Sequence, residues 1–192
     1  MNDKYDQLYK IAEDQAGYFT ANQARQVGFS YERLSSNTKK GRFSRVGHGI
    51  YRLEHFPASP FEDLFVAWLR TGPDSVISHQ SALSLYDLSD VLPHEIHVIV
   101  PRTASRRRDD LRLHTHKIRK DEITKREGLP VTTVARTIAD VAKANLSREL
   151  VLQAIEEALE KGMTTKNDLL QQAERQGGRA EEIIRDYYHN RG

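Results

Sequence analysis

The spacing of apolar residues near the start of the chain predicts three short helices, over residues 5–16, 21–27 and 31–40. A glycine follows each of them, as is common where a helix ends. Thr20 and Ser30 stand directly before the second and third helices, and hydroxyl side chains are favoured as helix N-caps. The chain is therefore expected to begin with three short, capped helices.

The third helix is expected to have one inward and one outward face. Its helical spacing predicts that Tyr31, Leu34 and Thr38 point inward, while the outward side chains are Arg33, Asn37 and Lys40. Residues 42–53 then alternate apolar and polar positions on both sides of Gly47-His48-Gly49, which predicts a tight β-hairpin. Three short helices followed by a basic hairpin indicate a winged helix-turn-helix.

A second region is expected after a linker at residues 54–59. Ser59-Pro60-Phe61-Glu62 combines a hydroxyl cap, a proline at the first helical position and a glutamate three residues after the cap, so it predicts a helix start. Further along, the pattern predicts strands over 75–78, 96–100 and 111–116, and helices over 80–85, 134–144, 147–161, 165–175 and 180–189. Ser78 is expected to cap the helix at 80–85.

These elements predict an α+β fold with two domains. Residues 1–54 form the expected winged helix-turn-helix DNA-binding domain. Residues 55–192 form a mixed α/β domain with a small sheet and several helices.

Composition narrows the class of protein. The 192 residues are 38% hydrophobic and 29% charged, which fits a globular protein. Neither a membrane-spanning apolar run nor a basic-then-apolar leader occurs, so we expect a cytoplasmic protein without a membrane partner. The absence of cysteine excludes disulfides, thiolate zinc sites, iron–sulfur clusters and a cysteine nucleophile.

Charge is unevenly distributed along the chain. Residues 1–54 carry a net +3, 55–100 a net −5, 101–126 a net +6 and 127–192 a net −2. Within residues 25–52, seven Lys and Arg face a single acidic residue. A basic helix beside a basic hairpin favours a polyanionic partner, and double-stranded DNA suits the expected fold.

The expected DNA-contacting residues follow from how this motif docks. The second helix of a helix-turn-helix enters the major groove, while flanking cations contact phosphates. The candidates are Arg25, Ser30, Tyr31, Arg33, Ser36, Asn37, Lys39, Lys40, Arg42, Arg45, His48 and Arg52. A second, separate basic segment offers a further contact for DNA or an acidic partner through Arg102, Arg106, Arg107 and Arg108.

Catalytic motifs are absent from the sequence. It contains no phosphate-binding loop, no dinucleotide fingerprint, no nucleophile elbow and no HExxH motif. His114 and His116 share one face of a predicted strand, and His94 and His97 flank the start of another, but no third ligand is evident beside either pair. We therefore expect no catalytic residue, no metal site and no cofactor. The helical carboxylates Asp140, Glu156, Glu157 and Glu160 are interpreted as a solvated face, with a metal-dependent nuclease as an alternative.

Two parts of the chain resemble the AbiEi antitoxins of bacterial type IV toxin–antitoxin, or abortive-infection, systems. Residues 17–24 (GYFTANQA) through 49–53 (GIYRL) resemble the family's winged-helix domain. Residues 77–88 (ISHQSALSLYDL) with Leu92-Pro93, and residues 131–140 (VTTVARTIAD), resemble its second domain and are the more specific matches.

The resemblance implies a transcriptional autorepressor that binds operator repeats through its winged helix, with self-association on DNA. It also implies an antitoxin whose C-terminal domain counters a nucleotidyltransferase-like toxin, without requiring a stable complex. Some relatives carry an added nuclease-like domain, for which this chain is short, so we expect no enzymatic activity. The alternative is a protein-binding module that neutralises its partner by direct contact, without specific DNA binding.

Overall fold

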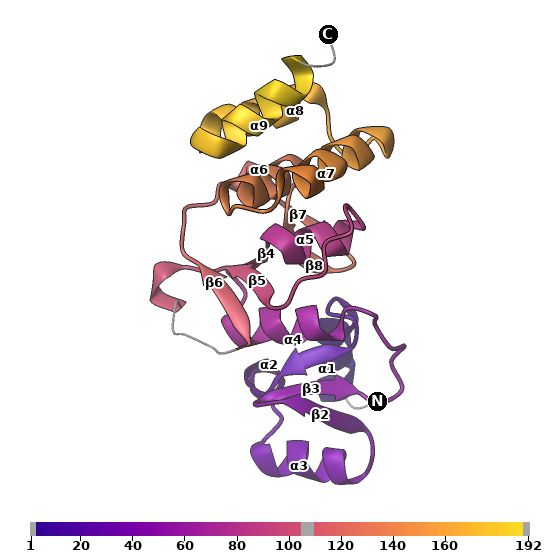
Figure 1. Cartoon of the computed structure of the whole chain (residues 1–192). Helices are drawn as coiled ribbons and strands as arrows, with labels where there is room; N and C mark the ends of the chain where they lie inside the picture. The colour runs from indigo at the N-terminus through magenta and orange to yellow at the C-terminus, as the bar shows by residue number, and fades with distance from the viewer. Residues whose placement is uncertain (1–2, 105–109, 190–192) are drawn as a thin grey trace. The chain divides into compact units, whose positions relative to one another are not determined.

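The computed structural model describes residues 3–104 and 110–189, and the chain divides into two compact units (Figure 1). The first unit comprises Met1–Asp74 with Glu127–Leu129. The second comprises Ser75–Arg126 with Pro130–Gly192. The fold is α+β, as predicted.

The first unit is a winged helix-turn-helix, as the sequence predicts. Its three strands form an antiparallel sheet in the order β1-β3-β2, with β2 and β3 as the expected hairpin. In chain order its elements are α1 (Asp3–Glu13), β1 (Tyr18–Thr20), α2 (Ala21–Gln26), α3 (Tyr31–Lys39), β2 (Phe43–Gly47), β3 (Ile50–Leu53) and α4 (Glu62–Thr71).

Both predicted N-caps are formed. The Thr20 hydroxyl accepts from the Gln23 backbone N–H at 3.1 Å, and the Gln23 side-chain oxygen accepts from the Thr20 N–H at 2.8 Å, which completes a capping box at the start of α2. The Ser30 hydroxyl accepts from the Arg33 N–H at 3.2 Å at the start of α3. These bonds fix where each helix of the motif begins.

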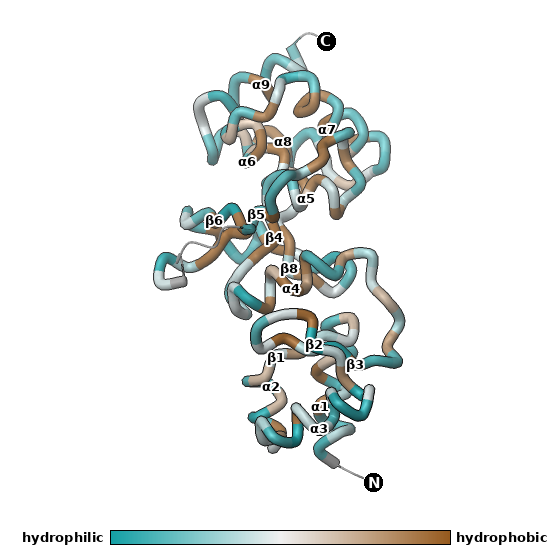
Figure 2. Tube along the Cα trace, turned by 60° about the horizontal axis from the view of Figure 1, so that its bottom comes forward, coloured by the Kyte–Doolittle hydropathy of each residue, from teal (hydrophilic) through white to brown (hydrophobic). Residues whose placement is uncertain are grey.

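An aromatic core holds the helices against the sheet. The rings of Phe19 and Phe43 meet edge to face with centroids 5.1 Å apart, and Phe29 lies 6.0 Å from Phe43. Leu8 and Leu34 complete the buried cluster from α1 and α3. Figure 2 shows brown, hydrophobic segments at β1 and teal, hydrophilic segments along the neighbouring helices.

Helix α4 belongs to the first unit, whose main segment ends at Asp74. The Tyr18 hydroxyl donates to Glu62 at 2.7 Å, and the Tyr18 ring stacks on Phe65 with centroids 5.4 Å apart. A helix capped by Ser59 would begin at Pro60, but α4 begins at Glu62. The Ser59 hydroxyl instead accepts from the Phe61 N–H and closes a turn before the helix.

The second unit contains a mixed five-stranded sheet in the order β6-β5-β4-β8-β7. Strand β4 pairs antiparallel with β5 and parallel with β8, while β5 and β6 are parallel. The strands are β4 (Val76–Ile77), β5 (Ile96–Ile99), β6 (Leu111–His114), β7 (Ile123–Arg126) and β8 (Leu129–Thr132).

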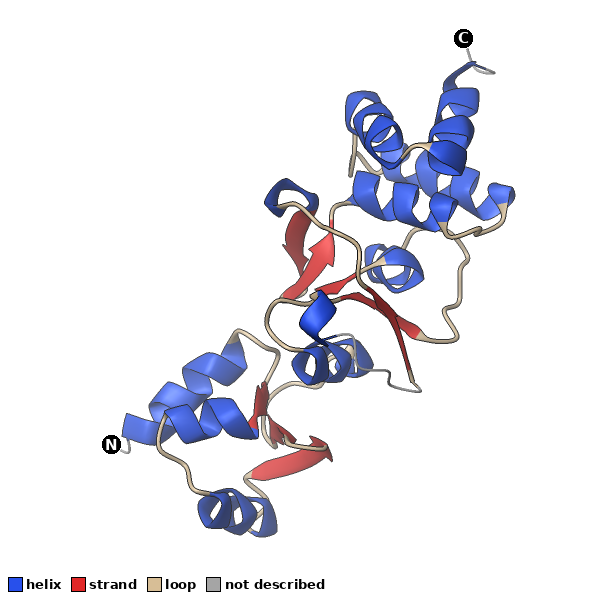
Figure 3. Ribbon diagram, turned by 90° about the vertical axis from the view of Figure 1, so that its left-hand side faces the viewer, coloured by secondary structure: helices blue, strands red, loops and turns tan. Residues whose placement is uncertain are grey.

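Helices gather around α6 in this unit (Figure 3). Helix α6 is buried along nearly its whole length and contacts α5, α7, α8 and α9. The helices are α5 (His79–Tyr86), α6 (Val134–Lys143), α7 (Arg148–Glu160), α8 (Lys166–Gln176) and α9 (Gly178–His189), with short 3-10 helices η1 (Arg102–Ala104) and η2 (Lys120–Glu122). Among the described residues, no helix combines the length and apolar character needed to cross a bilayer.

Candidate nucleic-acid interface

The outer face of α3 presents a polar and cationic surface. An open hollow on this face is lined by Tyr31, Glu32, Ser35, Ser36, Lys39 and Lys40. Tyr31 is the aromatic residue of this hollow, and it is 61% exposed. Helix α3 is the second helix of the helix-turn-helix, and the exposed face of that helix is the one that reaches the major groove.

The structure corrects the predicted orientation of two residues on α3. Asn37, predicted to face outward, is only 4% exposed. Its amide nitrogen donates to the Arg33 carbonyl at 2.7 Å, and its amide oxygen accepts from the Tyr5 hydroxyl. Tyr31, predicted to face inward, faces outward instead, whereas Leu34 is buried as predicted. The error arose because Asn37 finds a partner on α1, which helical spacing cannot reveal.

Two of the candidate arginines pack on aromatic rings. The Arg33 guanidinium lies 4.9 Å from the Phe29 ring centroid and 5.4 Å from that of Tyr5, and the side chain is half-buried. The Arg52 guanidinium lies 5.9 Å from the Tyr18 ring centroid and donates to the Phe56 carbonyl. These contacts support the fold and reduce the reach of both cations toward a ligand.

The other candidate cations lie on the surface. Arg25 lies against the exposed Tyr31, with its guanidinium carbon 5.4 Å from the ring centroid. Arg42 donates to the Tyr5 hydroxyl at 3.2 Å and remains exposed. Arg45 is exposed on β2 beside the turn that holds His48. With Lys39 and Lys40 on α3, helix and hairpin both present positive charge.

Sequence reasoning missed two residues of this face. Glu32 and Ser35 line the hollow, although neither was among the candidates. A hydrogen bond from the Ser30 hydroxyl lowers the pKa of Glu32, so the helix presents a carboxylate amid its cations. The signal that could have revealed them was the predicted burial of Leu34. Glu32 and Ser35 lie on a different side of the helix from Leu34, so they are expected to face outward.

The second basic segment is described only in part. Arg102 lies in η1 and is exposed. Arg106, Arg107 and Arg108 lie outside the described residues. A phosphate or partner contact by this segment stays a prediction.

A buried charge network connects η2 with α6 in the second unit. Arg136 Nη1 lies 2.7 Å from Glu122 Oε2, and Arg136 Nε lies 2.9 Å from Asp140 Oδ1. The side chains are 2%, 2% and 3% exposed, so Asp140 is not part of the solvated face that the sequence suggested. Burial raises the pKa of Asp140 to about 6, although the Arg136 charge opposes that rise.

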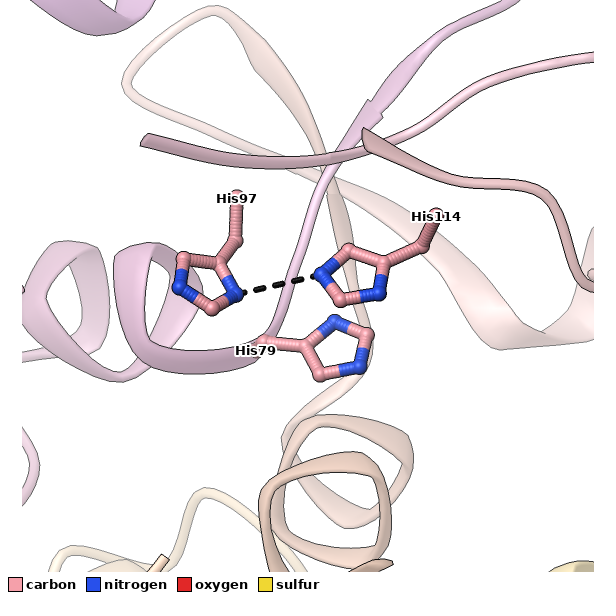
Figure 4. Close-up of side chains that lie close together, drawn as sticks. All are labelled: His79, His97 and His114. Carbon is pink, nitrogen blue, oxygen red and sulfur yellow. Dashed lines mark hydrogen bonds between the residues drawn. The ribbon is translucent and has the colours of Figure 1, made fainter. Parts of the chain in front are cut away.

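Four histidines meet near this network. His97 comes from β5, His114 ends β6, His116 follows it, and His79 begins α5. Burial, with a smaller effect of the neighbouring imidazoles, lowers the pKa of His79 to about 2 and that of His114 to about 4. Figure 4 shows His97 and His114 with ring nitrogens facing each other and His79 beneath them. His94 lies outside this cluster and is exposed.

Taken together, these features define a two-unit protein with a winged helix-turn-helix and a separate α+β unit. A model of the family described as "Transcriptional regulator, AbiEi antitoxin" matches residues 6–53, and one described as "AbiEi antitoxin C-terminal domain" matches residues 75–186. The chain belongs to the AbiEi antitoxin family. These are families of antitoxins and transcriptional regulators, not of enzymes.

One solved structure extends the comparison of folds. The RV2827C protein from Mycobacterium tuberculosis superposes with a TM-score of 0.56 at 12% sequence identity. The match covers 96% of this chain and 75% of that protein, so the similarity of fold includes both units. No curated protein matches the chain.

Proposed function

We propose that the winged helix-turn-helix binds operator repeats upstream of its own gene, in double-stranded DNA, and represses transcription there. The exposed hollow on α3 carries this proposal, because it combines hydroxyl, carboxylate and ammonium groups on the groove-facing side of the motif. Ser35, Ser36 and Glu32 are the side chains that suit contacts to base edges.

Phosphate contacts in this proposal come from the exposed cations. They are Arg25, Lys39, Lys40, Arg42 and Arg45, with His48 at the tip of the hairpin. Arg33 and Arg52 contribute less, because both side chains are partly buried, whereas Arg25 and Arg42 are exposed. Five phosphate contacts predict a slope of log K against log salt of about −4.5 for each winged helix. Binding of two copies to paired repeats doubles that value.

A mobility-shift titration tests the DNA half of the proposal. Full-length protein is titrated onto its upstream DNA and onto a scrambled duplex of equal length and composition. A reporter fused to the same upstream region measures repression in parallel. We expect a shifted complex and repression for the upstream DNA alone, and equal binding to both duplexes would overturn the operator assignment.

For the antitoxin half, we propose that the C-terminal domain, residues 55–192 in the sequence-based division, counters a nucleotidyltransferase-like toxin. The family match over residues 75–186 and the resemblance of its motifs support this role. Co-expression with a nucleotidyltransferase-like toxin tests it, and growth should be restored. Chains carrying K39A and R45A should still restore growth while losing repression. Loss of rescue in those chains would contradict separate roles for the two domains.

One observation favours the alternative of a protein-binding module. Tyr31 is an exposed aromatic residue at the start of α3, and tyrosine is enriched at protein interfaces. A complex with the toxin that forms on this face, resists salt and is lost in Y31A, together with no DNA shift, would favour that reading.

A further inference from the structure

The histidine cluster of the second unit has the composition and spacing of a metal site. Its members come from three separate stretches of the chain, so the fold itself brings them together. Two groups of three have ligand atoms within 4.8 Å of one another: His79, His97 and His114, and His79, His116 and Asp140.

The β5–β6 register explains how the first group forms. In this parallel pair His97 lies beside Arg112 and Ile99 lies beside His114. Residues two apart on a strand share a face, so His97 and His114 project from the same side of the sheet. The His79 ring then stacks on that of His114, with centroids 3.7 Å apart and planes within 9°. Three imidazoles therefore converge on one small region (Figure 4).

The separation of the two strand histidines suits a shared ligand. His97 Nδ1 and His114 Nε2 lie 3.1 Å apart. Two nitrogens bound to one tetrahedral zinc, each at about 2.0–2.1 Å, lie about 3.3 Å from each other. These two nitrogens share a hydrogen bond in the structure, so binding one ion would require both rings to turn until their lone pairs point toward it.

The backbone at His79 is unusual in a way that serves the cluster. His79 has φ +51°, a left-handed conformation that residues with a side chain rarely adopt. The sequence predicted that the Ser78 hydroxyl caps α5. Among the described residues it makes no such capping bond and instead lies 3.0 Å from His79 Nδ1. Such a hydroxyl orients an imidazole in the way that outer groups orient metal-binding histidines. Strained residues of this kind concentrate at functional sites.

A second observation is an unsatisfied carboxylate oxygen beside the cluster. Asp140 Oδ2 is buried and has no hydrogen-bond partner among the described residues. The other oxygen of Asp140 is held by Arg136 at 2.9 Å. The Arg136 charge disfavours a cation at the group that contains Asp140, so the group of three imidazoles is the stronger candidate.

We propose that His79, His97 and His114 bind a divalent transition-metal ion, with zinc as the ion that suits three imidazole ligands best. Three protein ligands leave a fourth position for water or for a group from a partner. The site revises the expectation of no metal, which rested on the missing third ligand. It concerns the second unit alone and does not depend on DNA binding.

Metal titration of the full-length, untagged chain tests the proposal, because a polyhistidine tag would itself bind zinc. After chelator treatment and dialysis, Co²⁺ is added and visible absorption is followed, and Zn²⁺ is then added in competition. We expect one ion per chain and the intense visible bands of tetrahedral Co²⁺, which zinc should abolish. Absence of stoichiometric binding would overturn the proposal.

Variants identify the ligands. The double variant H97A/H114A should lose the site, while H94A, which removes an exposed histidine outside the cluster, should bind as the parent does. H116A should also retain binding. Loss in H116A with retention in H97A/H114A would overturn the ligand assignment in favour of the group with Asp140. Because the double variant could unfold, imidazole ¹⁵N signals of the parent chain provide a second test: zinc should shift those of His79, His97 and His114, and unchanged signals would contradict the site.

Discussion

Arg136 Nη1 lies 2.7 Å from Glu122 Oε2, and both side chains are almost completely buried. The same guanidinium reaches Asp140 through Nε, so one cation serves two buried carboxylates. Removal of one partner from a buried ion pair is costly because the remaining charge stays in a poorly solvated place.

The first prediction compares this buried arginine with an exposed one. R136M should lower the free energy of unfolding by about 3–5 kcal/mol, because Glu122 and Asp140 lose their counter-charge. R185M removes the exposed Arg185–Glu181 pair on α9, whose atoms are 2.8 Å apart, and should cost about 0.5 kcal/mol or less. Urea denaturation of both variants checks this. Equal losses would contradict a structural role for the buried network.

The second prediction concerns the pH dependence of Tyr86. Its hydroxyl donates to the Thr132 carbonyl at 2.8 Å, and burial raises the pKa of Tyr86 to about 12. The unfolded chain releases this proton near pH 10, so between pH 10 and 12 the folded state binds more protons and stability falls as pH rises. The contribution of Tyr86 is complete below pH 10 and falls by about 1.4 kcal/mol per pH unit above it.

Y86F isolates this contribution. At neutral pH the variant should be less stable by about 1 kcal/mol, because the Thr132 carbonyl loses its donor. Above pH 10 the difference from the parent should shrink and then reverse. Denaturation at a series of pH values measures it, and a constant difference up to pH 12 would show that Tyr86 titrates normally.

The third prediction separates folding from DNA contact on α3. N37A should lower the free energy of unfolding by about 1–3 kcal/mol, because the amide bonds both Arg33 and Tyr5 in a buried position. K40A should change stability by less than about 0.5 kcal/mol, since Lys40 is exposed, while weakening DNA binding. Stability curves and anisotropy on the same samples compare the two. A destabilised K40A with unchanged DNA affinity would reverse these assignments.

The fourth prediction concerns Glu32, the carboxylate within the cationic face. E32Q should raise affinity for any duplex, because a negative charge no longer faces the phosphates, and should reduce preference for the operator if Glu32 contacts a cytosine. E13Q on α1, also exposed, is the matched control and should leave affinity unchanged. An E32Q chain with parental affinity on both duplexes would place Glu32 away from DNA.

Local chemistry made much of the winged helix-turn-helix predictable from sequence. The Thr20 and Ser30 caps and the hairpin around Gly47-His48-Gly49 depend on neighbours in the chain, and the structure forms all three. The strand β1 was missed because three residues, Tyr18–Thr20, are too few for a periodic pattern. Strands β7 and β8 were missed as well, because each has only four residues and Pro130 lies within β8.

Features that depend on distant partners were the ones that sequence misjudged. The prediction that Asn37 faces outward failed because the Tyr5 hydroxyl on α1 donates a hydrogen bond to the buried Asn37 amide oxygen. Asp140 was expected on a solvated helix face, but it is buried against Arg136, which also pairs with Glu122 from η2. The sequence paired His114 with His116 and His94 with His97, whereas the structure brings one member of each pair, His114 and His97, together. The third imidazole, His79, comes from α5 through a left-handed residue that no local pattern predicts.

The fifth prediction is the salt dependence of operator binding, because it measures directly whether the cations of α3 and the hairpin contact DNA phosphates. Fluorescence anisotropy of the full-length chain is measured on upstream and scrambled DNA at several salt concentrations, with K39A/K40A and the exposed α1 variant K10A in parallel. We expect tighter binding to upstream DNA and a slope of log K against log salt of about −4.5 for each bound winged helix. In K39A/K40A, but not in K10A, this slope should be smaller in magnitude by about 2. Equal affinity for both duplexes, or a slope that K39A/K40A leaves unchanged, would contradict DNA recognition by α3.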